Sequence, residues 1–494
     1  MKLSELLSSA GLPCVNKKHA GIQIGHVCCD SRVARADSVF VCIRGAVTDG
    51  HLYARSAYNL GCLAFVGEYK LDLPGDAAVV ICENPRFALA RLSAVLFGFP
   101  SRRLKVIGVT GTKGKTTTAL MIAGILNRCG IPTGYIGSNG ILFDSFRHHT
   151  ANTTPESCDL QRYMFEMAEC GIKYLALEVS SQAVYLERIR YLDFDTCVFT
   201  NLSPDHIGGA EHPDFNHYKA CKARLFSEYN PARAVVNAND PHTPDIIRNY
   251  RGEITTFGLG GSAHITAGNI TLLSPGNVLG TAFDFISGTY KKRTTLSLPG
   301  DFNIQNALAA AAVCQKIIPD TDKILSVLED IKVEGRFECM DALPYATIVI
   351  DYAHNGISLS SVLRTLRAYN PRRLICLLGS VGGRTQMRRR ELGAIASALC
   401  DFCILTADNP DCEDPVLVIR DIASAFVPGG CDYISIPDRR EAIMFAVGML
   451  REGDILLLAG KGHENYQLIK GIKWPFSEKE IVLEAAARIL KSPV

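Results

Sequence analysis

Hydrophobic and polar positions in the N-terminal part of the chain predict a small α/β unit. Apolar runs at residues 38–45, 62–69 and 77–83 have the length of buried strands. Helical patterns at residues 54–61 and 85–98 lie between and after them. A mixture of short strands and helices of this kind is typical of an α/β domain.

A second block begins with the apolar strand at residues 104–111 and alternates strands with helices. This alternation predicts a parallel sheet with crossover helices. Between about residues 253 and 300 the pattern changes to short alternating strands separated by Gly and Ser turns. We expect an antiparallel excursion there, followed by a helix at residues 305–317.

The third block begins near Gly335 and again alternates strands with helices. Its predicted strands are residues 346–355, 374–380, 402–410, 433–438 and 454–464. Polar residues or glycines end most of them, namely Asp351, Gly379, Asp408 and Gly460. Ligands of open α/β sheets bind outside the carboxyl ends of the strands. The pattern therefore indicates a second nucleotide-type fold with a binding site at that edge.

Together the blocks predict an α/β protein with three domains, at residues 1–102, 103–334 and 335–494. We expect a central P-loop mononucleotide-binding parallel sheet with an antiparallel excursion, and a C-terminal Rossmann-like domain. The length of 494 residues agrees with three domains of roughly 150 residues each.

Composition and charge narrow the class of protein. The formal net charge is +2 and no basic tract stands out, so we expect no nucleic-acid partner. The chain lacks an apolar run of about 18 residues and a signal-peptide pattern, so we expect no membrane partner. The 18 cysteines are scattered like reduced thiols, and no second pair joins Cys400 and Cys403 to make a zinc site. We expect a cytoplasmic monomer.

The strongest local motif is a glycine-rich loop between the strand at residues 104–111 and the helix after it. Glycines let backbone amides approach phosphate oxygens, and a helix N-terminus favours an anion. Lys115 supplies a charge for the terminal phosphates, and Thr116 supplies a hydroxyl for magnesium. The predicted ATP-binding residues are Gly111, Thr112, Lys113, Gly114, Lys115, Thr116 and Thr117. Because Val109 replaces the usual first glycine, a turn without a ligand is the alternative.

Two residues near strand ends are candidate magnesium ligands. Glu178 lies near the end of the strand at residues 174–182, where a buried carboxylate is costly unless it is paired or binds a metal. His206 follows the strand at residues 195–202, and a neutral imidazole can ligate magnesium or its water shell. The alternatives are a glutamate that caps the next helix and a structural Asp-His pair.

These pieces together resemble the Mur ligases, a family of ATP-dependent amino-acid ligases. The motifs occur in the family's order: TGTKGKTTT (110–118), NTTP (152–155), EVSSQ (178–182), TNLSPDHI (200–207), GDFNIQNALAAAA (300–312), EGRFE (334–338), DYAHN (351–355), ADNP (407–410) and GKGHE (460–464). DSR (30–32) adds the family's uridine-nucleotide signature. EVSS, DNP and GKGHE together indicate the branch that adds the third residue of the cell-wall peptide precursor.

The resemblance implies ATP and Mg²⁺ as cofactors. Asn306 would face the adenine, and Arg336 and Asp351 would hold ATP from the C-terminal domain. The magnesium ligands or near-ligands would be Thr116, Glu178, His206 and a carbamylated Lys222. A bare ammonium would be repelled by magnesium, whereas a carbamate is an anionic ligand. The nearby Lys219 is the competing candidate for the carbamate. The catalytic residues would be Lys115, His206 and Lys222.

The resemblance also implies the two other substrates. The residues that would hold UDP-N-acetylmuramoyl-dipeptide are Ser31, Asn152, Thr153, Thr154, Ser180 and Arg188. The residues that would hold the incoming diamino acid are Arg384, Asp408, Asn409, Asp411, Gly460 and Glu464. Among the latter, Arg384 would pair the α-carboxylate, and Asp408 with Glu464 would hold the amines.

Asp411 decides the expected amino acid. Members that add meso-diaminopimelate typically have an arginine there, which pairs the distal carboxylate. An aspartate would repel that carboxylate and attract an ammonium. We therefore expect L-lysine as the added amino acid, with meso-diaminopimelate or L-ornithine as alternatives. The alternative interpretation of Asp411 itself is a solvated acid in a loop, without a role in substrate selection.

Some positions depart from the family pattern and leave other functions open. Gln182 replaces a usual histidine, and the stretch 207–217 is longer than in the family, so we expect the geometry around a second metal to differ from the family's. A folylpolyglutamate-synthetase-like ligase is one alternative, although the DSR motif argues against it. A phosphate-loop motor or switch and a catalytically inactive binding module are the others.

Overall fold

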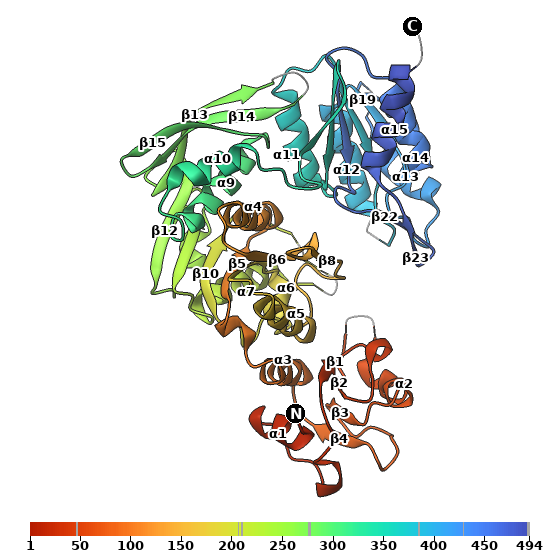
Figure 1. Cartoon of the computed structure of the whole chain (residues 1–494). Helices are drawn as coiled ribbons and strands as arrows, with labels where there is room; N and C mark the ends of the chain where they lie inside the picture. Colours follow the sequence, from red (N-terminus) through yellow and green to blue (C-terminus); the bar gives the residue numbers. More distant parts are fainter. Residues whose placement is uncertain are drawn as a thin grey trace. The chain divides into compact units, whose positions relative to one another are not determined.

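The computed structural model describes residues 1–45, 48–205, 207–208, 211–274, 278–383, 386–427 and 429–491 (Figure 1). The chain forms two compact units, of which the first contains Met1–Thr266 and Gln305–Ile324 and the second contains Ala267–Ile304 and Leu325–Val494. Helices α9 (Asp301–Cys314) and α10 (Thr321–Glu329) contribute residues to both units. Within the described ranges, no helix has the length and apolar composition that a membrane crossing requires.

The N-terminal part of the first unit is a parallel sheet in the order β1-β2-β3-β4. Its elements are α1 (Leu3–Ser9), β1 (His26–Cys28), β2 (Ser38–Val41), α2 (Ala54–Asn59), β3 (Ala64–Gly67), β4 (Ala78–Ile81) and α3 (Pro85–Leu96), with 3₁₀ helices η1 (Lys17–His19), η2 (Ser31–Val33), η3 (Gly50–Tyr53) and η4 (Pro100–Arg102). Val39 and Val41 pack with α1 and α3, whereas Phe40 and Cys42 pack with α2. Both faces of the sheet are therefore buried, which explains the unbroken apolar run in β2.

The remainder of the first unit is built on parallel strands in the order β6-β9-β5-β10-β11-β12, with β7 and β8 added antiparallel beyond β6. Its elements are β5 (Lys105–Thr110), α4 (Lys115–Arg128), β6 (Thr133–Gly137), β7 (Gly140–Phe143), β8 (Phe146–His148), α5 (Ser157–Glu169), β9 (Tyr174–Glu178), α6 (Ser181–Tyr185), β10 (Phe194–Phe199), α7 (Phe215–Ser227), β11 (Arg233–Asn237), α8 (Thr243–Ile246) and β12 (Glu253–Leu259). The predicted parallel sheet with crossover helices is confirmed.

The expected antiparallel excursion begins later than the sequence pattern predicted. The segment 253–259 is β12, and it pairs in parallel with β11 from Arg233↔Glu253 to Asn237↔Phe257. The expectation of an antiparallel strand there was wrong, because residues 238–252 contain α8 and are long enough for a crossover. Residue alternation alone does not distinguish the two strand directions.

The second unit contains the antiparallel strands β14 and β15 and a six-stranded sheet. Its elements are β13 (Ile265–Leu273, from Ala267 onward), β14 (Gly280–Ser287), β15 (Tyr290–Leu296), β16 (Glu338–Leu343), β17 (Ala346–Asp351), α11 (Gly356–Arg367), β18 (Leu374–Leu378), α12 (Gln386–Leu399), β19 (Phe402–Leu405), α13 (Pro415–Ala423), β20 (Asp432–Ser435), α14 (Arg439–Gly448), β21 (Ile455–Ala459), β22 (Tyr466–Ile469), β23 (Ile472–Pro475) and α15 (Glu478–Lys491). β14 and β15 pair antiparallel, and the large sheet has the order β16-β17-β21-β18-β19-β20. The α/β fold class is confirmed, while the boundaries at residues 102 and 334 stay a prediction.

A buried ion pair fixes the ends of two strands of the second unit. Arg439 at the start of α14 lies 2.7 Å from a carboxylate oxygen of Glu478 at the start of α15, and both side chains are almost fully buried. The Arg439 guanidinium also donates to the carbonyls of Ala407 and Ala459 at 3.1 and 3.0 Å. These carbonyls directly precede Asp408 and Gly460, so Arg439 holds the edge where a binding site was predicted.

Arg439→Ala is expected to destabilise the second unit by about 3–5 kcal/mol, because it leaves the Glu478 carboxylate buried without its partner. The neighbouring Arg440 forms an exposed pair with Glu484, so Arg440→Ala is a matched control with a much smaller loss. Hydrogen exchange of the β19 and β21 amides would measure the change. Equal protection in both variants would contradict the structural role of Arg439.

Candidate functional site

The glycine-rich loop joins β5 to α4 in a conformation that requires its glycines. Gly111 has φ +151° and Gly114 has φ +83°. A Cβ on Gly111 would lie 1.9 Å from Thr200 Oγ1, and one on Gly114 would lie 2.3 Å from Asn306 Oδ1. Both positions therefore exclude a side chain, and Asn306 packs directly against the loop.

The lysines of the loop surround the N-terminus of α4. Lys115 Nζ donates to the carbonyls of Gly111 and Thr112 at 2.9 and 3.0 Å. Lys113 donates its backbone amide to Asn201 Oδ1 at 2.9 Å, and its Nζ pairs with Asp205 at 3.0 Å. A lysine ammonium beside a helix N-terminus makes a site suited to the terminal phosphates of a nucleotide. Thr117 follows on the first turn of α4 and is buried.

Glu178 ends β9 and is fully buried beside the loop. Its Oε2 accepts a hydrogen bond from Thr116 Oγ1 at 3.0 Å. Its Oε1 accepts bonds from Tyr135 Oη at 2.5 Å and from the Ser138 amide at 2.9 Å. A carboxylate beside a threonine hydroxyl offers the hard oxygen ligands that magnesium prefers, so these residues fit the ion.

Lys222 lies on α7 and reaches the same loop from another element. It is almost fully buried, and its Nζ donates to the Gly111 carbonyl at 2.9 Å. Burial lowers the pKa of the Lys222 ammonium well below its usual value, and the nearby charge of Lys115 lowers it further. A larger fraction of Lys222 is thereby a neutral amine, the form that can react with carbon dioxide to give a carbamate.

Lys219 has a different environment on the same helix. Its Nζ pairs with Asp245 at 2.7 Å, and its side chain is partly exposed. The Lys219 nitrogen thus already has a carboxylate partner, so the geometry favours Lys222 over Lys219 for a carbamate. His206, the other predicted metal ligand of this region, lies outside the described residues.

Three of the residues predicted to hold the dipeptide gather at the end of β9. Thr154 Oγ1 donates to the Glu178 carbonyl at 2.7 Å and accepts from the Ser180 amide at 3.1 Å. Thr153 Oγ1 lies 3.1 Å from Ser138 Oγ, and Ser180 Oγ caps α6. Asn152 is exposed. Thr153, Thr154 and Ser180 are therefore next to the proposed magnesium ligand Glu178.

Two other predicted residues have surroundings that sequence reasoning did not anticipate. Arg188 pairs with Glu156 at 2.8 Å and donates to the Thr154 carbonyl at 3.3 Å. Its charge is thus already balanced, and it orients the segment that carries Thr154. Ser31 begins η2 on the N-terminal sheet, just after β1, and its side chain is partly exposed.

In the second unit, Asp351 is buried at the end of β17. One of its oxygens accepts from the Phe337 amide at 2.7 Å. Burial raises the pKa of the Asp351 carboxyl to about 6, against the opposing effects of the Arg336 guanidinium and the backbone amides. Arg336 stacks over the Tyr352 ring at 4.8 Å. Arg336 and Asp351, both predicted ATP-binding residues, are thus neighbours.

A buried polar cluster lies at the carboxyl ends of β19 and β21. Lys461 Nζ is 3.0 Å from Asn409 Oδ1, 3.2 Å from Glu464 and 3.5 Å from Asp408. Asn409 Nδ2 also donates to Glu464 Oε2 at 2.8 Å. Gly460 has φ +115°, and a Cβ there would lie 3.0 Å from Asp408 Oδ2. Sequence reasoning quoted GKGHE but did not single out Lys461, although its place between Gly460 and Glu464 was a usable signal.

Asp411 lies beside this cluster but is bonded to the β22–β23 hairpin. It has φ +50°, its Oδ1 accepts from the Gly471 amide at 2.7 Å, and its carbonyl accepts from the Lys470 amide at 2.9 Å. The Asp411 carboxylate therefore has a structural hydrogen bond to the turn between β22 and β23 that requires no substrate. Arg384, the predicted partner of the α-carboxylate, lies outside the described residues.

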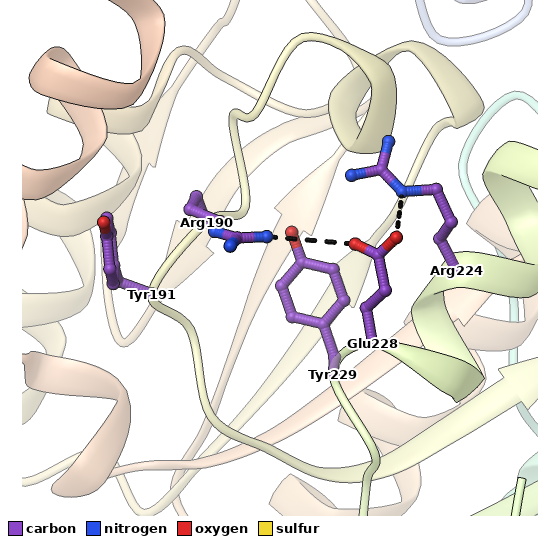
Figure 2. Close-up of a pocket in the computed structure, with 5 residues that line it drawn as sticks. All are labelled: Arg190, Tyr191, Arg224, Glu228 and Tyr229. Atoms are coloured by element: carbon purple, nitrogen blue, oxygen red, sulfur yellow. Dashed lines mark hydrogen bonds and ion pairs between the residues drawn. The ribbon is translucent and has the colours of Figure 1, made fainter.

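A cavity of about 630 Å³ in the first unit has none of the predicted site residues in its wall (Figure 2). Arg190, Tyr191, Arg224, Glu228 and Tyr229 line it. Figure 2 shows both arginines paired with the central Glu228, at 3.8 and 2.7 Å. Because the lining charges already pair with each other, the cavity is no competitor to the loop as a nucleotide site.

Two family models match the chain. The Mur ligase middle domain matches residues 109–314, and the Mur ligase glutamate ligase domain matches residues 335–462.

Proteins similar over their full length extend this result. A UDP-N-acetylmuramoyl-L-alanyl-D-glutamate--2,6-diaminopimelate ligase of Caldanaerobacter subterraneus subsp. tengcongensis is 34% identical, with 99% of each chain covered. A ligase of the same name from Bacillus velezensis is 36% identical, covering 99% of this chain and 100% of the relative. A solved structure of a ligase of that name has a TM-score of 0.68 and 26% identity, with 100% of both chains covered.

Gly114→Ala is expected to weaken nucleotide binding at least about tenfold, because a Cβ would meet Asn306 in addition to straining the backbone. Gly130→Ala is the matched control. Gly130 has nearly the same φ, +81°, but no described heavy atom lies within 4 Å of its Cβ position. Calorimetric titration with ATP and magnesium would measure both variants. Equal affinities would refute the role of the Gly114–Asn306 contact.

Proposed function

The chain belongs to the Mur ligase family, whose members are ATP-dependent acid–amino-acid ligases, and we propose that it adds a diamino acid to UDP-N-acetylmuramoyl-L-alanyl-D-glutamate. The polar cluster of Asp408, Lys461 and Glu464 carries this proposal. Two carboxylates around one ammonium leave a net negative charge in a buried place, which suits an incoming ammonium. The names of the relatives support the same substrate class.

The reaction has two steps. An oxygen of the D-glutamyl γ-carboxylate attacks the γ-phosphorus of ATP, and the bond to the bridging oxygen breaks to release ADP. The amine of the diamino acid then attacks the carbonyl carbon of the acyl phosphate, loses a proton, and expels phosphate as the peptide bond forms. Such a reaction depends on positioning and on neutralising negative charge.

Residues of the first unit suit the first step. Lys115 would neutralise charge on the transferred phosphoryl group, as expected beside the N-terminus of α4. Thr116 and Glu178 would hold Mg²⁺, which supplies further positive charge to the phosphate oxygens. Thr153, Thr154 and Ser180 lie next to Glu178 and would orient the dipeptide. A carbamate on Lys222 would turn a buried amine into an anionic group.

For the amino acid, we propose meso-diaminopimelate first. The relatives at 34–36% identity are named for it. The expectation of L-lysine depends on the charge of Asp411, and the hydrogen bond to the Gly471 amide supports a structural role for that carboxylate. L-Lysine is the second candidate, because no arginine stands at position 411 to pair a distal carboxylate.

An assay with the muramoyl-dipeptide, ATP and magnesium, offering meso-diaminopimelate, L-lysine and L-ornithine separately, tests the substrate. We expect product with meso-diaminopimelate and an unchanged preference in Asp411→Asn, since the amide oxygen keeps the bond to Gly471. Mass spectrometry would identify the product. If the wild type instead forms product with lysine, and Asp411→Asn loses the preference for lysine, the charge at position 411 selects the amino acid. No product with any amino acid would refute the proposed function.

Lys222→Ala is expected to reduce turnover by at least about 100-fold, since it removes the carbamate that would help to hold Mg²⁺ at the reacting phosphate. Short carboxylic acids should partly restore it by occupying the place of the carbamate. Lys219→Ala is the matched control on the same helix and should lose much less, because Lys219 pairs with Asp245. If acids rescue Lys219→Ala instead, the carbamate belongs to Lys219. Phosphate release would report turnover.

A further inference from the structure

Two histidines and a cysteine converge at the start of α7, outside the residues assigned to the ligase reaction. His212 precedes the helix, while His217 and Cys221 lie one turn apart on it. One potential ligand atom from each of the three lies within 4.8 Å of those from the other two. His212 Nδ1 is 2.8 Å from His217 Nδ1, and His217 Nδ1 is 3.9 Å from Cys221 Sγ. Residues spaced i and i+4 share a helix face, so α7 presents two ligands together.

We propose that His212, His217 and Cys221 bind a divalent cation of the zinc class. Imidazole nitrogen and thiolate sulfur are ligands for zinc, whereas magnesium prefers oxygen. The site is thus chemically distinct from the Thr116–Glu178 oxygen pair. It goes beyond the ligase function and does not depend on it.

The spacing of the atoms suits such an ion. In a tetrahedral zinc site, two nitrogens lie about 3.3 Å apart, and a nitrogen and a sulfur about 3.6 Å apart. The nitrogens of His212 and His217 would separate by about half an ångström, and Cys221 would approach by a few tenths of an ångström. Both shifts are within reach of side-chain torsions. A water molecule would complete four ligands.

A hydrogen bond to Ser181 orients His212 as a metal ligand. His212 is fully buried, and its Nε2 lies 2.9 Å from Ser181 Oγ at the start of α6. When Nε2 carries the proton and donates to that oxygen, Nδ1 is the unprotonated nitrogen, and it lies 2.8 Å from His217 Nδ1. A metal-bound histidine is commonly oriented by a hydrogen bond from its other nitrogen. Ser181 would therefore fix both the ring and its tautomer.

The site is accessible, and its occupation would join three segments. His217 is partly exposed, so an ion can enter from solvent, and the ring of Tyr185 packs edge-on against it at 4.9 Å. Binding releases the proton of the Cys221 thiol, which leaves one anionic and two neutral ligands. The ion would tie His212, which lies three residues before the start of α7, to that helix and, through Ser181, to α6. Lys222 follows Cys221 on α7, so it lies on the helix that the ion would fix in place.

Cobalt(II) titration of the chelator-treated full-length protein tests the proposal. We expect one equivalent to bind with a thiolate-to-cobalt charge-transfer band, zinc to displace it, and excess magnesium to leave it in place. Cys221→Ala should abolish the band, and Ser181→Ala should weaken binding roughly 10–100-fold. Cys170→Ala, an exposed cysteine outside the cluster, is the matched control and should retain the band.

The proposal is overturned if the wild type gives no thiolate band, or if Cys221→Ala keeps the band of the Cys170→Ala control. The second outcome would assign the cobalt to other cysteines. Circular dichroism would establish that each variant is folded. If Cys221→Ala does not fold, His217→Ala, which alters a less buried side chain, replaces it and should lower the affinity by at least about tenfold. Activity is not the readout, so failure here leaves the ligase proposal intact.

Discussion

The burial of the Glu178 carboxylate constrains the phosphate-loop region of the first unit. A carboxylate without exposed surface is costly unless donors surround it. Thr116, Tyr135 and Ser138 supply those donors from α4, from β6 and from the residue that follows β6. The start of α4 and the ends of β6 and β9 must therefore meet at one point. At that meeting point Gly137, the last residue of β6, cannot carry a side chain, because its Cβ would lie 2.1 Å from Glu178 Oε1.

Lys222 adds a second buried titratable group, an amine, beside the same loop. Helix α7 places its Nζ beside the Gly111 carbonyl, and burial together with the nearby charge of Lys115 lowers the pKa of its ammonium. In the second unit, charged side chains are likewise buried at the ends of β19 and β21. There Arg439 donates to the carbonyls of Ala407 and Ala459, and Lys461 balances only part of the charge of Asp408 and Glu464. Both units thus place incompletely balanced charge at strand ends, where charged substrates would bind.

The sequence by itself determined the elements that depend on local patterns. Apolar runs predicted β5, β9 and β17–β19, and the glycine and lysine spacing predicted the phosphate loop, because strand burial and loop conformation are properties of short segments. The motifs also indicated the family correctly. The sequence did not determine the added amino acid, because the charge of Asp411 does not reveal that its carboxylate accepts a hydrogen bond from the Gly471 amide.

Only the tertiary structure decided which distant groups meet. It made β12 parallel, bonded Asp411 to Gly471, and paired Arg188 with Glu156. It also brought His212 to Ser181 and to the His217–Cys221 face of α7. Residue alternation records which side of a strand is buried, but neither the direction of its neighbour nor the partner of a polar side chain. Those follow from how segments far apart in the chain pack, because a buried polar group must find its partner in space.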